Sequence, residues 1–251
     1  MNKSVFYLLS IALWSQACNT SSSKSPKNDQ YAIQTEAKHI MLGSEGKSCT
    51  IDLRYELAKS GPEKTKKIIN RIIEDDLRKL LRENANTTFT TTSLTDNANS
   101  AMQHCQGIND EYYMMNLWAN HKIYPSKEGF VTISMFYEAY TGGAHPNHAT
   151  QMMVLSEKTG EQLTLAKIFR DTLELTKFCE TQFRNDYQLG LDTNINAEGL
   201  WFKNDKFALN NNFGFVNDTL LFWYNPYEIA SFAAGDIVLK IKPEDWKKLR
   251  K

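Results

Sequence analysis

The feature that most constrains this chain is a short apolar segment at residues 5–13, followed by a cysteine at position 18. The segment is too short to cross a bilayer, which takes about 20 apolar residues. The small residues Ser15 and Ala17 precede Cys18, as at the end of a bacterial lipoprotein signal peptide. We therefore expect residues 1–17 to be a signal peptide and Cys18 to carry a lipid. An ordinary secretory peptide with a chance cysteine is the alternative.

Residues 19–30 are polar, small and without periodicity, as in a flexible tether. We expect residues 18–30 to be the lipidated cysteine and its linker. No later apolar run of the sequence is long enough to span a membrane. The prediction is an exported protein whose soluble domain, in the periplasm or at the cell surface, is attached to an envelope membrane through the lipid alone. The leaflet and the membrane stay open.

The charge balance argues against a nucleic-acid partner. Lys plus Arg and Asp plus Glu both number 29, so the net charge is zero and no general field attracts a polyanion. Hydrophobic residues make up 41% of the chain, which is typical of a globular domain. We expect a packed body without nucleic-acid binding.

Three cysteines follow Cys18, at positions 49, 105 and 179. Export implies an oxidising compartment, in which one disulfide forms and one thiol is left over. We favour a bond between Cys49 and Cys105, because both lie in the N-terminal half. The spacings match no zinc motif, and neither a metal nor another cofactor is predicted.

The first half of the domain has a clear strand and a clear helix. Residues 49–57 alternate apolar and polar side chains, as in a half-buried strand. Ser60 and Glu63 have the spacing of a capping box, and an amphipathic helix of about 20 residues follows. Residues 86–100 are rich in Thr and Asn and are expected to form a loop or an exposed β-ribbon.

The second half alternates strands and helices. The strands are expected at residues 111–124, 130–140, 151–155, 213–216, 220–224 and 236–241, and the helices from Asp171 to about 189 and from Pro243. Asn217 and Asp218 indicate a hairpin turn. Tight turns between strands predict an α+β fold with one or more antiparallel sheets and helices packed on one face. We expect two subdomains, at residues 31–125 and 126–251.

Three segments are more specific than their composition, at residues 136–147, 159–169 and 224–235. In this order and spacing they resemble the extracellular domain of PdaC-type peptidoglycan deacetylases and RsiV-type lysozyme-sensing anti-sigma factors, a family of domains of unknown function. The resemblance implies an α+β domain outside the membrane. In RsiV-type proteins this domain binds lysozyme, and in PdaC-type proteins it accompanies a separate deacetylase domain. Our chain resembles the extracellular module alone.

The candidate binding residues lie in two of these segments. They are Tyr140, Gly142, Gly143, His145, Asn147, Tyr227 and Glu228. The paired glycines allow a turn with positive φ after a strand, from which His145 would project. A tight turn bonded to nearby backbone is the alternative, and so is a metal site containing His145 and His148. Glu228 could act as a general acid or base, or cap backbone amides.

These residues predict contact with a ligand and not a reaction, and we assign no catalytic residue. The expected function is a cell-envelope lipoprotein that binds a lysozyme-like protein or a peptidoglycan fragment. The alternatives are a hydrolase of cell-wall material acting through His145 and Glu228, and a purely structural surface lipoprotein. The hydrolase requires that these two side chains meet in one pocket.

Overall fold

The computed structural model describes residues 33–44, 48–109 and 113–251. The predicted signal peptide, Cys18 and the linker lie outside these residues. No helix in the described ranges combines the length and the apolar character that a membrane span requires.

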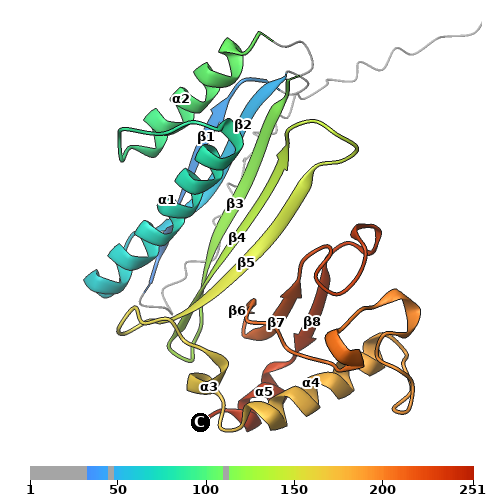
Figure 1. Cartoon of the computed structure of the whole chain (residues 1–251). Coiled ribbons are helices and arrows are strands. Elements are labelled where there is room, and N and C mark those ends of the chain that lie inside the picture. Colours follow the sequence, from blue (N-terminus) through green and yellow to red (C-terminus); the bar gives the residue numbers. More distant parts are fainter. Residues whose placement is uncertain (1–32, 45–47, 110–112) are drawn as a thin grey trace, which may run out of the picture.

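A five-stranded sheet forms the centre of the molecule (Figure 1). Its strands, in spatial order, are β1 (Thr35–Leu42), β2 (Cys49–Ala58), β3 (Met115–Pro125), β4 (Phe130–Tyr140) and β5 (Asn147–Ser156). The predicted α+β class is confirmed, but the sheet is mixed, because β2 and β3 are parallel. Parallel neighbours need a long crossover connection, which two helices provide here.

These two helices, α1 (Glu63–Ala85) and α2 (Leu94–Gly107), cover one face of the sheet. The buried stripe of α1, which includes Ile69, Ile73 and Leu77, joins the core of the sheet. The predicted helix is therefore confirmed, but its capping box is wrong. Pro62 is the N-cap residue and supplies no side-chain bond, while Glu63 pairs with Lys66 at 2.7 Å.

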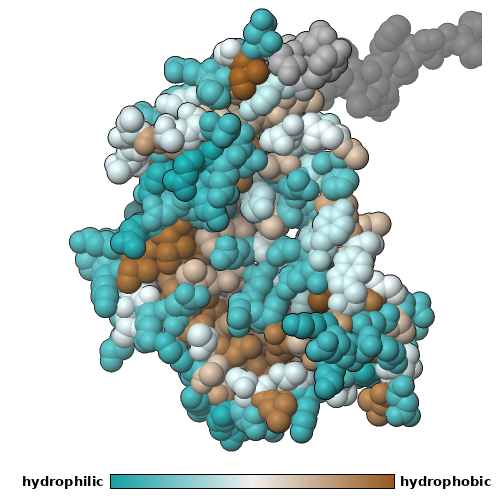
Figure 2. Space-filling view, in the orientation of Figure 1, coloured by the Kyte–Doolittle hydropathy of each residue, from teal (hydrophilic) through white to brown (hydrophobic). Residues whose placement is uncertain are grey.

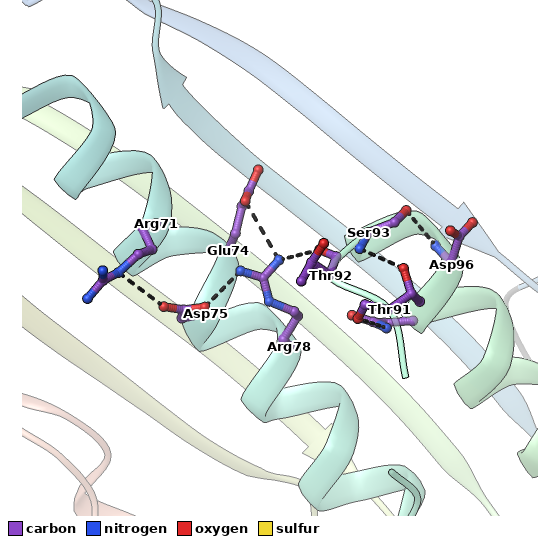
Figure 3. Close-up of polar contacts among 9 residues, drawn as sticks. Arg71, Glu74, Asp75, Arg78, Thr91, Thr92, Ser93 and Asp96 are labelled. Atoms are coloured by element: carbon purple, nitrogen blue, oxygen red, sulfur yellow. Dashed lines mark hydrogen bonds and ion pairs between the residues drawn. The ribbon is translucent and has the colours of Figure 1, made fainter. Parts of the chain in front are cut away.

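The prediction of a loop or ribbon at residues 86–100 is wrong for its second half, where α2 begins. Ser93 caps the helix, since its hydroxyl accepts a bond from the Asp96 amide at 3.2 Å (Figure 3). Arg78 of α1 donates to the carbonyl of Thr92 at 2.8 Å and fixes the connection. Because the segment is rich in Asn and Thr, its helical face of small residues was not recognised from the sequence. Ala98 on this face is fully buried.

A second, antiparallel sheet contains β6 (Phe213–Val216), β7 (Thr219–Tyr224) and β8 (Ile237–Ile241). The helices α4 (Thr172–Asp186) and α5 (Pro243–Leu249) pack on this second sheet. The short elements of this part of the chain are α3 (Leu165–Ile168), η1 (Ala197–Gly199), η2 (Lys203–Asp205) and η3 (Phe232–Ala234). The hairpin turn at Asn217 and Asp218 is confirmed, with φ of 50° and 62°. Asp171 caps α4 by accepting from the amides of Leu173 and Glu174.

The second sheet packs on the face of the first sheet that α1 and α2 leave uncovered. Gly214 permits this, because a Cβ atom there would lie 2.4 Å from Cγ2 of Thr132. The Thr132 hydroxyl accepts a bond from the Phe215 amide at 2.8 Å. The subdomain boundary expected at residue 125 falls between β3 and β4, which are neighbours in one sheet. The two cores meet at residues of β4 and β5, such as Phe130 and Val154.

An ion-pair cluster connects the β3–β4 turn to α5, and it should make the stability of the protein depend on pH. Glu128 bonds to Lys247 at 2.8 Å and also pairs with Arg250. The bond from Lys247 holds the pKa of Glu128 below its ordinary value of 4.5. A carboxylate with a lowered folded pKa stabilises the fold above its unfolded pKa, and this contribution disappears as the pH falls through the folded pKa.

We therefore expect Glu128→Gln to lower the Tm at pH 7 by about 2–4 °C, the shift that 1 kcal/mol produces in a chain of this size. The difference should shrink towards zero in acid, where the wild-type carboxyl is protonated. Thermal unfolding followed by circular dichroism at several pH values measures this. Glu244→Gln, an exposed change on α5, is the control. An equal loss for Glu128→Gln at every pH would contradict the ion-pair account.

Candidate functional site

The uncovered part of the five-stranded sheet forms a groove of about 820 Å³. Side chains alternate along a strand, and Asp52, Trp118 and Glu138 are paired across β2, β3 and β4, so all three point to the groove side. The other principal lining residues are His39, Met41, Thr50, Arg54, Asn116, Tyr140 and His145. The groove thus combines an exposed Trp and Met, at 36% and 46%, with several polar groups.

A row of rings crosses the first sheet from the groove to the part of the chain that contains the second sheet. This part, from α3 to α5, is the second subdomain. The aromatic row consists of Trp118, Phe136, His148, Phe232 and Tyr227. Successive ring centroids are 4.9, 6.2, 5.6 and 5.7 Å apart. These spacings are typical of mutually packed aromatic side chains. The row therefore presents rings whose positions are fixed by their neighbours.

The loop after β4 lies against this row. Gly142 and Gly143 have φ of 97° and 104°, as the sequence predicted for a turn there. The Tyr140 hydroxyl donates to the Gly143 carbonyl at 2.9 Å. The exposed His145 stacks on Phe232 with centroids 3.8 Å apart, and its Nδ1 lies 2.9 Å from the Pro146 carbonyl. The loop is a tight, internally bonded turn that still exposes its histidine beside the groove.

The other candidate residues lie elsewhere. Asn147 and Glu228 line a second cavity of about 720 Å³ at the edge of β5, the β5-edge cleft. The Glu228 carboxylate accepts bonds from the Asn225 amide at 3.0 Å and from Nδ2 of Asn210 at 2.7 Å. Glu228 thus has the backbone-capping role considered above. The exposed Tyr227 ends the aromatic row.

His145 and Glu228 have different hydrogen-bond partners and line different cavities. His148 lies 3.6 Å from Asp236, and no described residues form a group of three or more His, Cys, Asp or Glu that could hold a metal ion. Burial raises the pKa of the Cys179 thiol to about 12, so it stays protonated and unreactive.

Sequence reasoning missed the apolar residues of the groove and of the aromatic row beside it. Trp118, Phe136 and Met41 occupy the polar-facing positions of their strands, where an apolar side chain is unexpected. Apolar side chains at the polar-facing positions of β3 and β4 were visible in the sequence and could have indicated these residues. Phe232 had no such signal, because it reaches the row only through the packing of the second subdomain.

Comparison with known proteins finds one matching family model and solved structures of similar fold. A family model described as "Protein of unknown function (DUF3298)" matches residues 166–244. A DUF3298 family member from Bacteroides fragilis NCTC 9343 is similar with a TM-score of 0.66 and 18% identity, over 88% of this chain and 95% of that one. A DUF3298 family protein from Pseudomonas aeruginosa PAO1 has a TM-score of 0.59 and 14% identity, over 89% and 96%. No curated protein matches.

At these identities the two solved structures show a shared fold and nothing of the ligand. The family match independently covers the helices and strands of the second subdomain, from α4 through β8. The prediction of a domain of unknown function is confirmed. Residues 166–244 match the DUF3298 family model, and the fold of the chain is similar to that of the solved DUF3298 family proteins.

Proposed function

We propose that this protein is a cell-envelope binding module and that a lysozyme-like protein docks on the groove. One observation carries the proposal: Trp118, Met41, Tyr140 and Arg54 meet on an uncovered sheet face. Trp, Tyr and Arg are the residue types that dominate the energy of protein interfaces, and Met is also enriched there. The resemblance to RsiV-type domains supports a lysozyme-like partner, and a peptidoglycan fragment is the other ligand to test.

The groove is prepared for contact in two ways. The Trp118 ring packs edge-on against Phe136, so that little side-chain freedom is lost when a partner covers it. Polar groups beside the ring are already paired, since Asp52 accepts bonds from Arg54 at 2.9 Å and contacts His39 at 2.8 Å. A partner would therefore meet an apolar centre with an ordered polar rim, the usual anatomy of an interface.

The proposed location follows from the N-terminal sequence. A lipid on Cys18 and the polar residues 19–30 would hold the domain near a membrane surface and leave the groove free to turn towards a partner. Mass spectrometry of the mature protein should show an acylated N-terminal cysteine. An unmodified first residue would refute the anchor without touching the groove.

Trp118→Ala tests the groove. We expect it to weaken lysozyme binding by at least about tenfold, because truncation of a central interface Trp costs about 2 kcal/mol or more. Isothermal titration calorimetry with the purified protein measures the Kd. Trp201→Ala is the matched control, since Trp201 is 44% exposed and lies outside the groove.

Two results would refute the proposal. One is equal lysozyme affinity in the Trp118 and Trp201 variants. The other is a folded wild-type protein that binds no lysozyme. Binding of muropeptides in place of lysozyme, lost in Trp118→Ala, would keep the groove as the site and replace the partner.

A further inference from the structure

The β5-edge cleft is distinct from the groove. It lies between α1, which contributes Lys79 and Leu80, and the segments beside β6 and β7, which contribute Asn211 and Asn225. Its volume of about 720 Å³ is within the range of small-molecule sites. Figure 2 shows hydrophilic residues mixed with apolar ones between α1 and the second subdomain.

One wall of the cleft is built by side-chain amides that replace a neighbouring strand. Oδ1 of Asn225 accepts from the Thr150 amide, and Oδ1 of Asn212 accepts from the Met152 amide, both at 2.7 Å. The Nδ2 atoms of the same two residues donate to the Thr150 carbonyl. The Glu228 carboxylate in turn accepts a bond from the backbone amide of Asn225. The wall is therefore rigid, and the edge of β5 is closed there to an added strand.

Other polar groups of the cleft have no partner inside the protein. The side-chain amides of Asn147, Gln151, Gln162 and Asn211 are exposed and make no hydrogen bond to any residue that the structure describes, so a ligand can reach them. Thr150 is 2% exposed, and its hydroxyl oxygen also lacks a partner. A buried hydroxyl without a hydrogen bond is costly. Each of these groups can both donate and accept.

The charges around the cleft disfavour an anion. Three carboxylates, of Asp76, Glu83 and Glu228, lie in its lining against one ammonium, of Lys79. Leu80 and the half-buried Tyr137, with neighbouring methionines of β5, add apolar surface. The cleft thus offers unpaired donor–acceptor groups, apolar patches and an acidic rim.

We infer that the β5-edge cleft binds a neutral saccharide of mono- or disaccharide size. Sugar hydroxyls both donate and accept, so they match the exposed side-chain amides of Gln151 and Asn211. The apolar faces of the sugar ring can pack on Tyr137 and Leu80. An extended peptide fits less well, because Asn212 and Asn225 already occupy the β5 amides that such a peptide would use.

The experiment titrates the purified full chain with N,N′-diacetylchitobiose and with cellobiose, followed by saturation-transfer NMR and calorimetry. We expect saturable binding of at least one disaccharide. Gln151→Met and Asn211→Leu each keep about the same side-chain size and remove one exposed amide, and each should weaken binding about fivefold or more. Thr35→Val, an exposed change on β1 outside both cavities, is the matched control.

Gln151→Met and Asn211→Leu remove no internal side-chain bond and should fold as the wild type does, which circular dichroism checks. Absence of binding to both disaccharides by the folded protein would overturn the inference. Binding unchanged in both cleft variants would do the same, as would binding of trialanine in place of a sugar. These titrations contain no lysozyme, so their failure is distinct from failure of the groove.

Discussion

Replacement of Trp246 by alanine is expected to destabilise the protein by about 3–5 kcal/mol, as for other fully buried Trp residues. Trp246 on α5 has no exposed surface, and its ring lies 4.8 Å from that of Phe215. The indole N–H also donates to the Asp218 carbonyl at 2.8 Å. The substitution would leave a cavity between α5 and the second sheet and an unpaired carbonyl in the hairpin turn.

Urea unfolding followed by circular dichroism measures this loss. Trp246→Phe, which keeps most of the ring and removes the hydrogen bond, should lose less, about 1–2 kcal/mol. Leu173→Ala is the control for an exposed apolar residue, because Leu173 is 61% exposed. A loss below about 1 kcal/mol for Trp246→Ala would mean that α5 contributes little to the second core.

Removal of the disulfide should also lower the free energy of unfolding by a large amount. Cys49 at the start of β2 and Cys105 near the end of α2 are bonded, as predicted, across 56 residues of chain. By the chain-entropy relation, opening a loop of this length costs about 4 kcal/mol. The double variant Cys49→Ser with Cys105→Ser should therefore lose about this amount in urea unfolding.

The wild-type protein treated with a reducing agent should match the double variant, since Cys179 is free in both states. A midpoint of unfolding that does not change on reduction would show that the bond does not constrain the unfolded chain. Cys179→Ala in the oxidised protein serves to separate the effect of that buried thiol.

Part of the candidate site could be predicted from the sequence. The turn at Gly142 and Gly143 and the projection of His145 followed from local chemistry, because glycine can adopt positive φ without steric cost. The partners of the Glu228 carboxylate did not all follow from local sequence. One is the backbone amide of Asn225, but the other is Nδ2 of Asn210, which is 18 residues away.

The sequence alone determined the elements whose energy is local: the amphipathic helix α1, the cap at Asp171 and the turn at Asn217 and Asp218. Their signals lie within a few residues, as helix periodicity, capping and turn preferences do. Only the tertiary structure decided that β2 and β3 are parallel, and that Trp118 and Phe232 belong to one row. Such contacts depend on how whole elements pack, and the stabilisation they give appears only after long loops have closed.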